Sequence, residues 1–188
     1  MYKFLTDEEL IRFLGIENNF VNPFDFGQST FFTIDALTRF INSKLALEIG
    51  TCEGYGTRIM ATNCQEVVTV DIHSYREYTL NPQQNNELKP INEIGKASFM
   101  YNNVHQLFTD SSNLGRFLNM EFDFIFIDGS HDMMHVKSDT TYAISHIDSP
   151  GIIMWHDYTN VPDVTNYLNS LGDPDIYHTG QWNAFKIF

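Results

Sequence analysis

Short apolar runs alternate with longer segments of mixed polarity from about residue 45 to the end of the chain. Nearly continuous apolar strands that alternate with helical segments are typical of a parallel sheet covered by helices on both faces. The predicted strands are 45–49, 67–72, 104–108, 122–127 and 151–155, and the predicted helices are 55–62, 112–118, 133–147 and 161–171. We therefore expect a doubly wound, Rossmann-like α/β fold.

The C-terminal end of the chain adds two more strands to this expectation. The runs 176–178 and 184–187 are separated by only a few residues, so they must pair as an antiparallel hairpin. The sheet is thus expected to have seven strands, mostly parallel, with an antiparallel C-terminal strand.

The N-terminal part and one internal segment depart from the strand–helix alternation. The capping-box pattern at Thr6–Glu9 opens a short helix, and a second helix is expected over 29–42. Residues 1–44 should therefore pack as helices on a core domain, 45–188, within one structural domain. The stretch 73–98 is rich in Asn, Gln and Tyr and follows the second strand, so we expect an irregular loop beside the ligand site.

Charge and cysteine content narrow the range of partners and compartments. Lys and Arg number 11 against 24 Asp and Glu, which gives a formal net charge of −13. Such a surface repels nucleic acid and anionic membranes, and it favours a small neutral or cationic partner. Cys52 and Cys64 are expected to be buried thiols in a reducing compartment. No secretory leader or long apolar run is found, so we expect a cytoplasmic protein.

A glycine turn follows the first core strand, in the segment Leu47-Glu48-Ile49-Gly50-Thr51-Cys52-Glu53-Gly54. Gly50 and Gly54 are either ordinary turn residues or positions where a ligand approaches the backbone. Asp71 ends the second strand about twenty residues later, where a carboxylate can hold the ribose of an adenosine ligand. The spacing is not GxGxxG, which disfavours a nicotinamide cofactor.

Polar residues also follow the later strands. Asp110 and Ser111 end the third strand and either contact adenine or cap a helix. Asp128-Gly129-Ser130-His131 ends the fourth strand, and His156-Asp157 ends the fifth. Because parallel strands end at one edge, these clusters should converge on one crevice, where His131 could take a proton from a bound hydroxyl.

Four segments together resemble the class I S-adenosylmethionine-dependent methyltransferases. They are Leu-Glu-Ile-Gly-Thr at 47–51, Val-Asp at 70–71, Phe-Ile-Asp-Gly-Ser-His at 126–131 and Trp-His-Asp-Tyr at 155–158. More narrowly they resemble the methyltransferase domain 24 type, whose relatives include macrolide-sugar and catechol O-methyltransferases. The resemblance covers about 24–188 and implies O-methylation of a small hydroxylated acceptor such as a sugar.

The resemblance also implies roles for individual residues. Those implied to bind S-adenosylmethionine are Glu48, Gly50, Thr51 and Gly54 around the methionine part, Asp71 at the ribose, Asp110 and Ser111 near adenine, and Asp128 beside the cofactor. Asp128 and His131 are the implied catalytic residues. Asp128, His156 and Asp157 stand where metal-dependent relatives bind a divalent cation, Mg²⁺, Mn²⁺ or Fe²⁺. A histidine at 156 departs from the family's acidic pair and suits Mn²⁺ or Fe²⁺ better than Mg²⁺.

Two other functions stay open at this point: a module that binds an adenosine ligand without catalysis, and a nicotinamide-dependent oxidoreductase. The oligomeric state is open too, and a homo-oligomer is one outcome. An aromatic N-terminal group could form core, acceptor pocket or dimer contact, and it consists of Phe20, Phe24, Phe26, Phe31 and Phe32.

Overall fold

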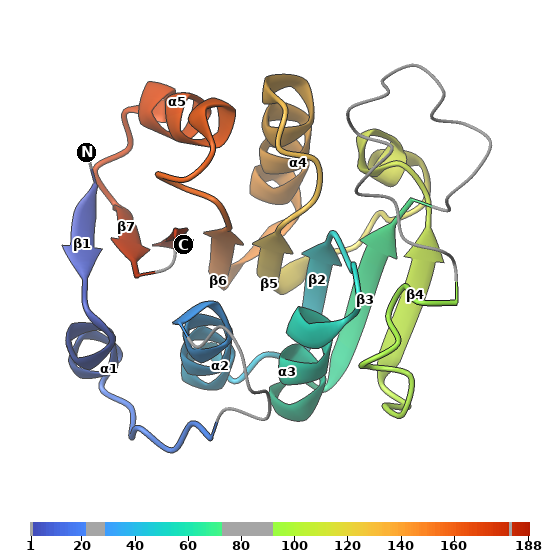
Figure 1. Ribbon diagram of the computed structural model, residues 1–188, viewed down its shortest axis with the longest axis horizontal. Coiled ribbons are helices and arrows are strands. Elements are labelled where there is room, and N and C mark those ends of the chain that lie inside the picture. The colour runs from blue at the N-terminus through green and yellow to red at the C-terminus, as the bar shows by residue number, and fades with distance from the viewer. Residues whose placement is uncertain (1, 22–28, 73–91, 181) are drawn as a thin grey trace.

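The computed structural model describes residues 2–21, 29–72, 92–180 and 182–188. Within these residues, one eight-stranded sheet lies between two layers of helices, in the order β1-β7-β8-β6-β5-β2-β3-β4 (Figure 1). The strands are β1 (Lys3–Leu5), β2 (Leu45–Ile49), β3 (Glu66–Asp71), β4 (Val104–Phe108), β5 (Phe122–Ile127), β6 (Ile147–Trp155), β7 (Ile176–Thr179) and β8 (Asn183–Ile187). The helices are α1 (Asp7–Leu14), α2 (Ser29–Ile41), α3 (Tyr55–Asn63), the 3₁₀ helix η2 (Ser111–Arg116), α4 (Met133–His146) and α5 (Pro162–Leu171).

The strand directions confirm the predicted fold class, with one correction. Strands β2, β3, β4, β5 and β6 are all parallel to one another, and β8 runs antiparallel to both β6 and β7. The described sheet has eight strands rather than seven, because β1 pairs in parallel with β7 at one edge. This strand is only three residues long and buries only Leu5, so its sequence carries no period-two pattern.

Alternate residues of the central strands face two separate cores. Phe124 and Phe126 of β5 pack with residues of α1, α2 and α3, whereas Ile125 and Ile127 pack with residues of α4 and α5. Figure 1 shows these two helix layers below and above the sheet. Since both faces are covered, the strands are apolar on both sides, which explains their unbroken hydrophobic runs.

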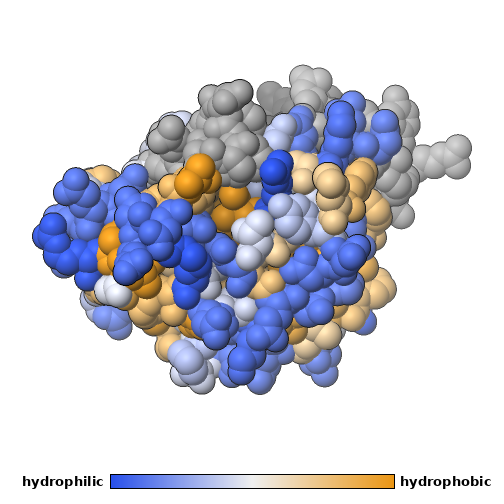
Figure 2. All heavy atoms as spheres, turned by 90° about the horizontal axis from the view of Figure 1, so that it is seen from below, coloured by the Kyte–Doolittle hydropathy of each residue, from blue (hydrophilic) through white to orange (hydrophobic). Residues whose placement is uncertain are grey.

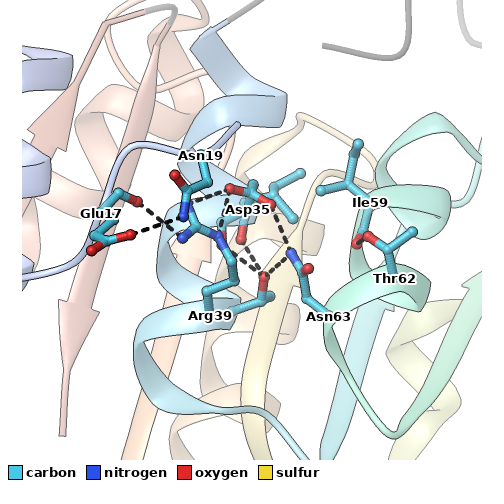
Figure 3. Close-up of polar contacts among 9 residues, drawn as sticks. Glu17, Asn19, Asp35, Arg39, Ile59, Thr62 and Asn63 are labelled. Carbon is cyan, nitrogen blue, oxygen red and sulfur yellow. Dashed lines mark hydrogen bonds and ion pairs between the residues drawn. The ribbon is translucent and has the colours of Figure 1, made fainter. Parts of the chain in front are cut away.

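The N-terminal segment is joined to the core by packing and by polar contacts. Thr6 and Glu9 form the predicted capping box, in which Oγ1 of Thr6 accepts from the Glu9 N–H. Asp35 lies at the centre of a polar group that links α2 to its surroundings (Figure 3). Its carboxylate accepts from Nε of Arg39 at 2.8 Å and from Nδ2 of Asn63 at 3.0 Å, and Arg39 donates to the backbone oxygen of Glu17.

The aromatic N-terminal group is divided by the structure. Phe32 is buried in the core below the sheet, and Phe20 and Phe31 are partly buried against it. Phe24 and Phe26 lie outside the described residues, as does most of the predicted 73–98 loop. The core interpretation is confirmed for Phe32, whereas for Phe20 and Phe31 the three alternatives stay open.

The surface beside α1, α2 and α3 is mostly hydrophilic, with hydrophobic areas between the hydrophilic side chains (Figure 2). Among the described helices, none has the length and apolar character needed to cross a membrane. Of the two cysteines, Cys64 is buried as expected, but Cys52 is exposed. That part of the prediction was wrong because Cys52 lies in the turn after β2, with a left-handed φ of 48°.

Candidate active site

Gly50 places the turn after β2 directly against the end of β5. Its φ is +101°, and a Cβ atom there would lie 2.1 Å from the backbone oxygen of Asp128. The two strand ends are also joined by a hydrogen bond from Asp128 N to Ile49 O at 2.8 Å. Glycine is therefore required at this position, because no side chain fits between the two loops.

Gly54 has a similar role on the other side of the turn. It is the N-cap of α3 with φ +83°, and a Cβ atom would lie 2.8 Å from the Cα atom of Gly95. The observed reason for both glycines is thus contact with a neighbouring protein segment. Whether a cofactor also approaches them stays a prediction.

Asp71 lies at the glycine turn, as its position at the end of β3 predicted. Its carboxylate accepts hydrogen bonds from the backbone N–H groups of Cys52 and Ile72, both at 2.7 Å. Burial raises the pKa of Asp71, and these backbone bonds partly offset that rise. The carboxylate is thereby held in one orientation at the carboxyl edge of the sheet.

Glu48 is buried beneath the same turn, on the face of the sheet covered by α3. Its Oε2 accepts from the hydroxyls of Thr57 and Thr69, and Thr69 in turn contacts Oγ1 of Thr51 at 2.6 Å. Burial raises the pKa of Glu48 to about 8, even though the two threonine bonds oppose the shift. The two predicted residues Glu48 and Thr51 therefore belong to one internal polar network.

Asp110 and Ser111 begin η2 at the same edge. Asp110 accepts from the backbone N–H of Ser112 at 2.8 Å, so its role as a helix cap is confirmed, while contact with adenine stays a prediction. Nδ1 of His135 lies 2.6 Å from Oδ2 of Asp132, and its Nε2 lies 3.9 Å from Oδ1 of Asp110. This histidine joins η2 to α4.

Sequence reasoning did not single out Asp132 or His135. The sequence could have indicated this pair through helix capping, because Asp132 is the N-cap of α4 and His135 follows three residues later. Burial opposes the charge of Asp132, but hydrogen bonds from Ser130 and His135 lower its pKa to about 2.

The predicted crevice residues at the ends of β5 and β6 converge. Nε2 of His131 lies 2.8 Å from Oδ2 of Asp157 and 3.7 Å from Oδ1 of Asp128. Nδ1 of His156 lies 3.1 Å from Oδ1 of Asp128 and 3.0 Å from Oδ2 of Asp157. We call these four residues the His–Asp cluster; two imidazoles share two carboxylates in it.

The charges in the His–Asp cluster stabilise one another. Contacts with two carboxylates, of which Asp128 has the larger effect and Asp157 the smaller, raise the pKa of His131 to about 10. Burial would lower the pKa of His156, but hydrogen bonds to the same carboxylates outweigh it and raise that pKa to about 10. Burial likewise opposes the charge of Asp157, and the contacts with both histidines hold its pKa far below the usual range.

A divalent cation fits the cluster. One ligand atom each from Asp128, His131 and Asp157 lies within 4.8 Å of the others. Nε2 of His131 is buried and, despite its short contact with Asp157, has no partner among the described residues with hydrogen-bond geometry. His156 faces the same two carboxylates through Nδ1. Mixed nitrogen and carboxylate donors suit Mn²⁺, Fe²⁺ or Zn²⁺.

Three further observations concern the surroundings of the cluster. Asp157 has a left-handed φ of 60°, an uncommon backbone state for a residue other than glycine. Nε2 of His156 lies 3.2 Å from the hydroxyl of Thr30 in α2, and the ring of Trp182 meets the His156 ring edge-on. Sequence reasoning missed Thr30 and Trp182, although an aromatic residue in the tight turn between two predicted hairpin strands was a usable signal.

Comparisons with known proteins agree with this architecture. A sequence profile of the family described as "Methyltransferase domain" matches residues 47–158. The O-methyltransferase NovP is 12% identical, with a TM-score of 0.67, over 84% of this chain and 78% of that one. An O-methyltransferase from Bacillus cereus in complex with SAH is 16% identical, with a TM-score of 0.56, over 95% and 87%. An SAH-bound methyltransferase from Podospora anserina is 18% identical, with a TM-score of 0.60, over 96% and 86%. A search of curated proteins returned no match.

Proposed function

Because the chain belongs to the methyltransferase-domain family, we propose that it uses S-adenosylmethionine to methylate a hydroxyl oxygen of a small acceptor such as a sugar. The observation that carries this proposal is the His–Asp cluster, which lies beside the glycine turn after β2. Gly50 packs on the backbone of Asp128, so a ligand held at the turn would lie next to the cluster.

The cofactor residues follow from their places at this edge. Asp71 is held against the glycine turn, and it would bind the ribose hydroxyls. Asp110 and Ser111 would lie near adenine, whereas Glu48, Gly50, Thr51 and Gly54 would surround the methionine part, with Asp128 alongside. Bound S-adenosylmethionine supplies a methyl group already activated by its sulfonium charge. The protein then needs to align the acceptor and remove its proton.

We assign proton removal to His131. Its Nε2 is buried and lacks a hydrogen-bond partner of proper geometry among the described residues. While Asp128 and Asp157 carry full negative charges, they keep His131 protonated. Once those charges are neutralised, Nε2 would be able to accept the proton of an acceptor hydroxyl.

A divalent cation on Asp128, Asp157 and His156 would supply that neutralisation and lower the pKa of the hydroxyl. His156 would be oriented for this role, because Nδ1 faces both carboxylates while its second nitrogen lies against the hydroxyl of Thr30. His131 is the rival third ligand, since it belongs to the group of converging donors. One histidine nitrogen cannot bind an ion and accept a proton at once, so the two histidines must divide these roles.

Mn²⁺ titration of two variants tests this division. His156→Gln should weaken Mn²⁺ binding by more than about 100-fold, which exceeds the usual loss from changing a residue that only supports a ligand. His131→Gln should retain binding and lose turnover. The reverse result would assign the ion to His131. His105→Gln is the matched control, since His105 is exposed and pairs with Glu66, away from the cluster.

A methyl-transfer assay tests the function itself. Purified protein, labelled S-adenosylmethionine, Mn²⁺ and a panel of sugars and phenols should yield an O-methylated product. Asp128→Asn should abolish turnover yet leave binding of S-adenosylhomocysteine within a few-fold, while the exposed Glu121→Gln should match the parent protein. An Asp128→Asn variant with full activity would overturn the assignment.

The two rival functions give different results in the same experiments. A module without catalysis would bind S-adenosylhomocysteine but form no product across the panel. A nicotinamide-dependent oxidoreductase would bind NAD in preference, which calorimetry distinguishes. The acidic surface disfavours nucleic acid, and the two free thiols agree with a reducing, cytoplasmic location.

A further inference from the structure

Trp182 lies in the turn between β7 and β8, with 46% of its surface exposed and a φ of 66°. Hairpin turns usually place glycine or asparagine at positions with positive φ, and a bulky residue there is strained. The fold thus holds a large aromatic side chain at the surface in an unfavourable backbone state. Such strain is often found at functional sites.

The indole contacts one member of the His–Asp cluster, His156. The ring centroids of Trp182 and His156 are 6.5 Å apart, with an angle of 75° between the ring planes. The Nδ1 edge of His156 touches both carboxylates of the cluster, and its Nε2 faces Thr30. Trp182 therefore borders the side of the cluster formed by α2 and the C-terminal hairpin.

The other tryptophan shows what a purely structural role looks like in this chain. Trp155 is 2% exposed, packs in the core above the sheet and donates from Nε1 to Oγ1 of Thr140 at 2.9 Å. Trp182 is not buried in this way, and its ring meets His156 of the proposed reaction centre edge-on.

We propose that Trp182 selects the acceptor by packing against the apolar face of an uncharged, hydroxylated six-membered ring; this rests on the proposed function. An indole offers a flat apolar surface at small entropic cost, so it favours ring acceptors over open-chain ones. A hydroxyl on the ring edge would then point to Asp128 and Asp157. Sugar rings and phenols share this shape, whereas the net charge of −13 disfavours anionic acceptors.

Fluorescence provides a test that does not require turnover. Trp182 is exposed and Trp155 is buried, so acrylamide should quench mainly the emission of Trp182. Methyl β-glucopyranoside or catechol, added with S-adenosylhomocysteine and Mn²⁺, should protect the parent protein from quenching. Glycerol at the same concentration should not protect it. In Trp182→Phe only the emission of Trp155 remains, and neither ring compound should change its quenching.

Kinetics provide the second readout. Trp182→Ala should raise the acceptor KM about tenfold with little change in kcat or in the affinity for S-adenosylhomocysteine, and Trp182→Phe should restore most of the loss. Phe117→Ala is the matched control, because Phe117 is an exposed aromatic residue at the end of η2.

The outcomes separate this inference from the proposed function. Equal KM values for Trp182→Ala and Phe117→Ala, or protection by glycerol alone, would overturn the role of Trp182 and leave the methyltransferase proposal intact. Protection by a ring compound without any methylated product would support ring binding at Trp182 and overturn the methyltransferase proposal. Protection by only one of the two ring compounds identifies the acceptor as a sugar or a phenol.

Discussion

Asp157 shows how single residues establish the chemistry of this site. Its left-handed φ of 60° turns the chain sharply after β6. Its carboxylate then meets His131 at 2.8 Å and His156 at 3.0 Å. Such a backbone state is costly for a residue other than glycine, and here the cost is offset by two charge-assisted contacts.

The positions of the candidate site residues were largely predictable because these residues follow strands. Parallel strands end at one edge, so Asp71, Asp128 and Asp157 could be placed together from their positions after apolar runs. Contacts between distant elements could not be predicted in this way. The approach of Thr30 to His156 depends on how α2 lies across the sheet, which the periodicity of one helix does not specify.

Glu48 carries a prediction about pH. Its pKa is about 8 in the folded protein and near 4.5 when unfolded, so the folded state keeps a proton that the unfolded state has lost between these values. This contribution to stability is complete below pH 4.5 and declines as the pH rises to 8. Glu48→Gln removes the titration, so its free energy of unfolding should fall less than that of the parent between pH 5 and pH 8.

Urea denaturation at pH 5, 6.5 and 8 measures this difference. The parent and Glu48→Gln share every other titrating group, including the two histidines of the cluster, so those contributions cancel in the comparison. Glu121→Gln changes an exposed carboxyl in the same way and serves as the control. Parallel curves for the parent and Glu48→Gln would show that Glu48 ionises normally in the folded protein.

At the scale of elements, the turn after β2 joins the proposed cofactor region to the His–Asp cluster. Gly50 lies on the backbone of Asp128, and Gly54 lies on Gly95 in the segment that precedes β4. Three loops at the carboxyl edge are therefore packed directly on one another. A displacement of one loop would move the others, so the site depends on close backbone contact as well as on its side chains.

Gly50→Ala tests this contact. The new Cβ atom would lie 2.1 Å from the oxygen of Asp128, and φ would remain at +101°, so we expect a loss of roughly 2 kcal/mol or more in the free energy of unfolding. Gly115→Ala is the control, because nothing lies within 4 Å of that position and its φ is not left-handed. Equal urea midpoints for the two variants would show that the loops are not tightly packed.

Most elements could be predicted from the sequence, and the exceptions have physical reasons. The apolar runs of β2, β3, β4 and β5 mark these strands within one residue. β6 begins four residues before the predicted 151–155, because its first part is polar and largely exposed and so shows no apolar run. The segment expected as a helix over 112–118 is instead the 3₁₀ helix Ser111–Arg116, which begins at the Asp110 cap. β1 was missed because three residues with one buried side chain cannot show a period.

At the scale of the whole molecule, the sheet is a scaffold with its chemistry at one edge and an acidic surface around it. The division into helices at 1–44 and a core domain at 45–188 stays a prediction, although α1 and α2 bury their apolar side chains in the same core as β5 and β6. With 24 acidic and 11 basic residues, repulsive pairs outnumber attractive ones. Repulsion between like charges therefore lowers the stability of the folded chain.

This imbalance predicts that salt stabilises the fold. Raising the ionic strength from 0.01 M to 0.15 M shortens the screening length from about 30 Å to about 8 Å, which weakens long-range repulsion more than close ion pairs such as Lys186–Asp173. A gain of about 1 kcal/mol would raise Tm by roughly 2–4 °C in a chain of this size. Calorimetry should find this rise with both NaCl and tetramethylammonium chloride, since screening does not depend on the cation.

A rise with NaCl alone that disappears in Asp157→Asn would instead indicate Na⁺ binding at the His–Asp cluster. An unchanged Tm with both salts would show that net repulsion contributes little to the stability of this acidic protein.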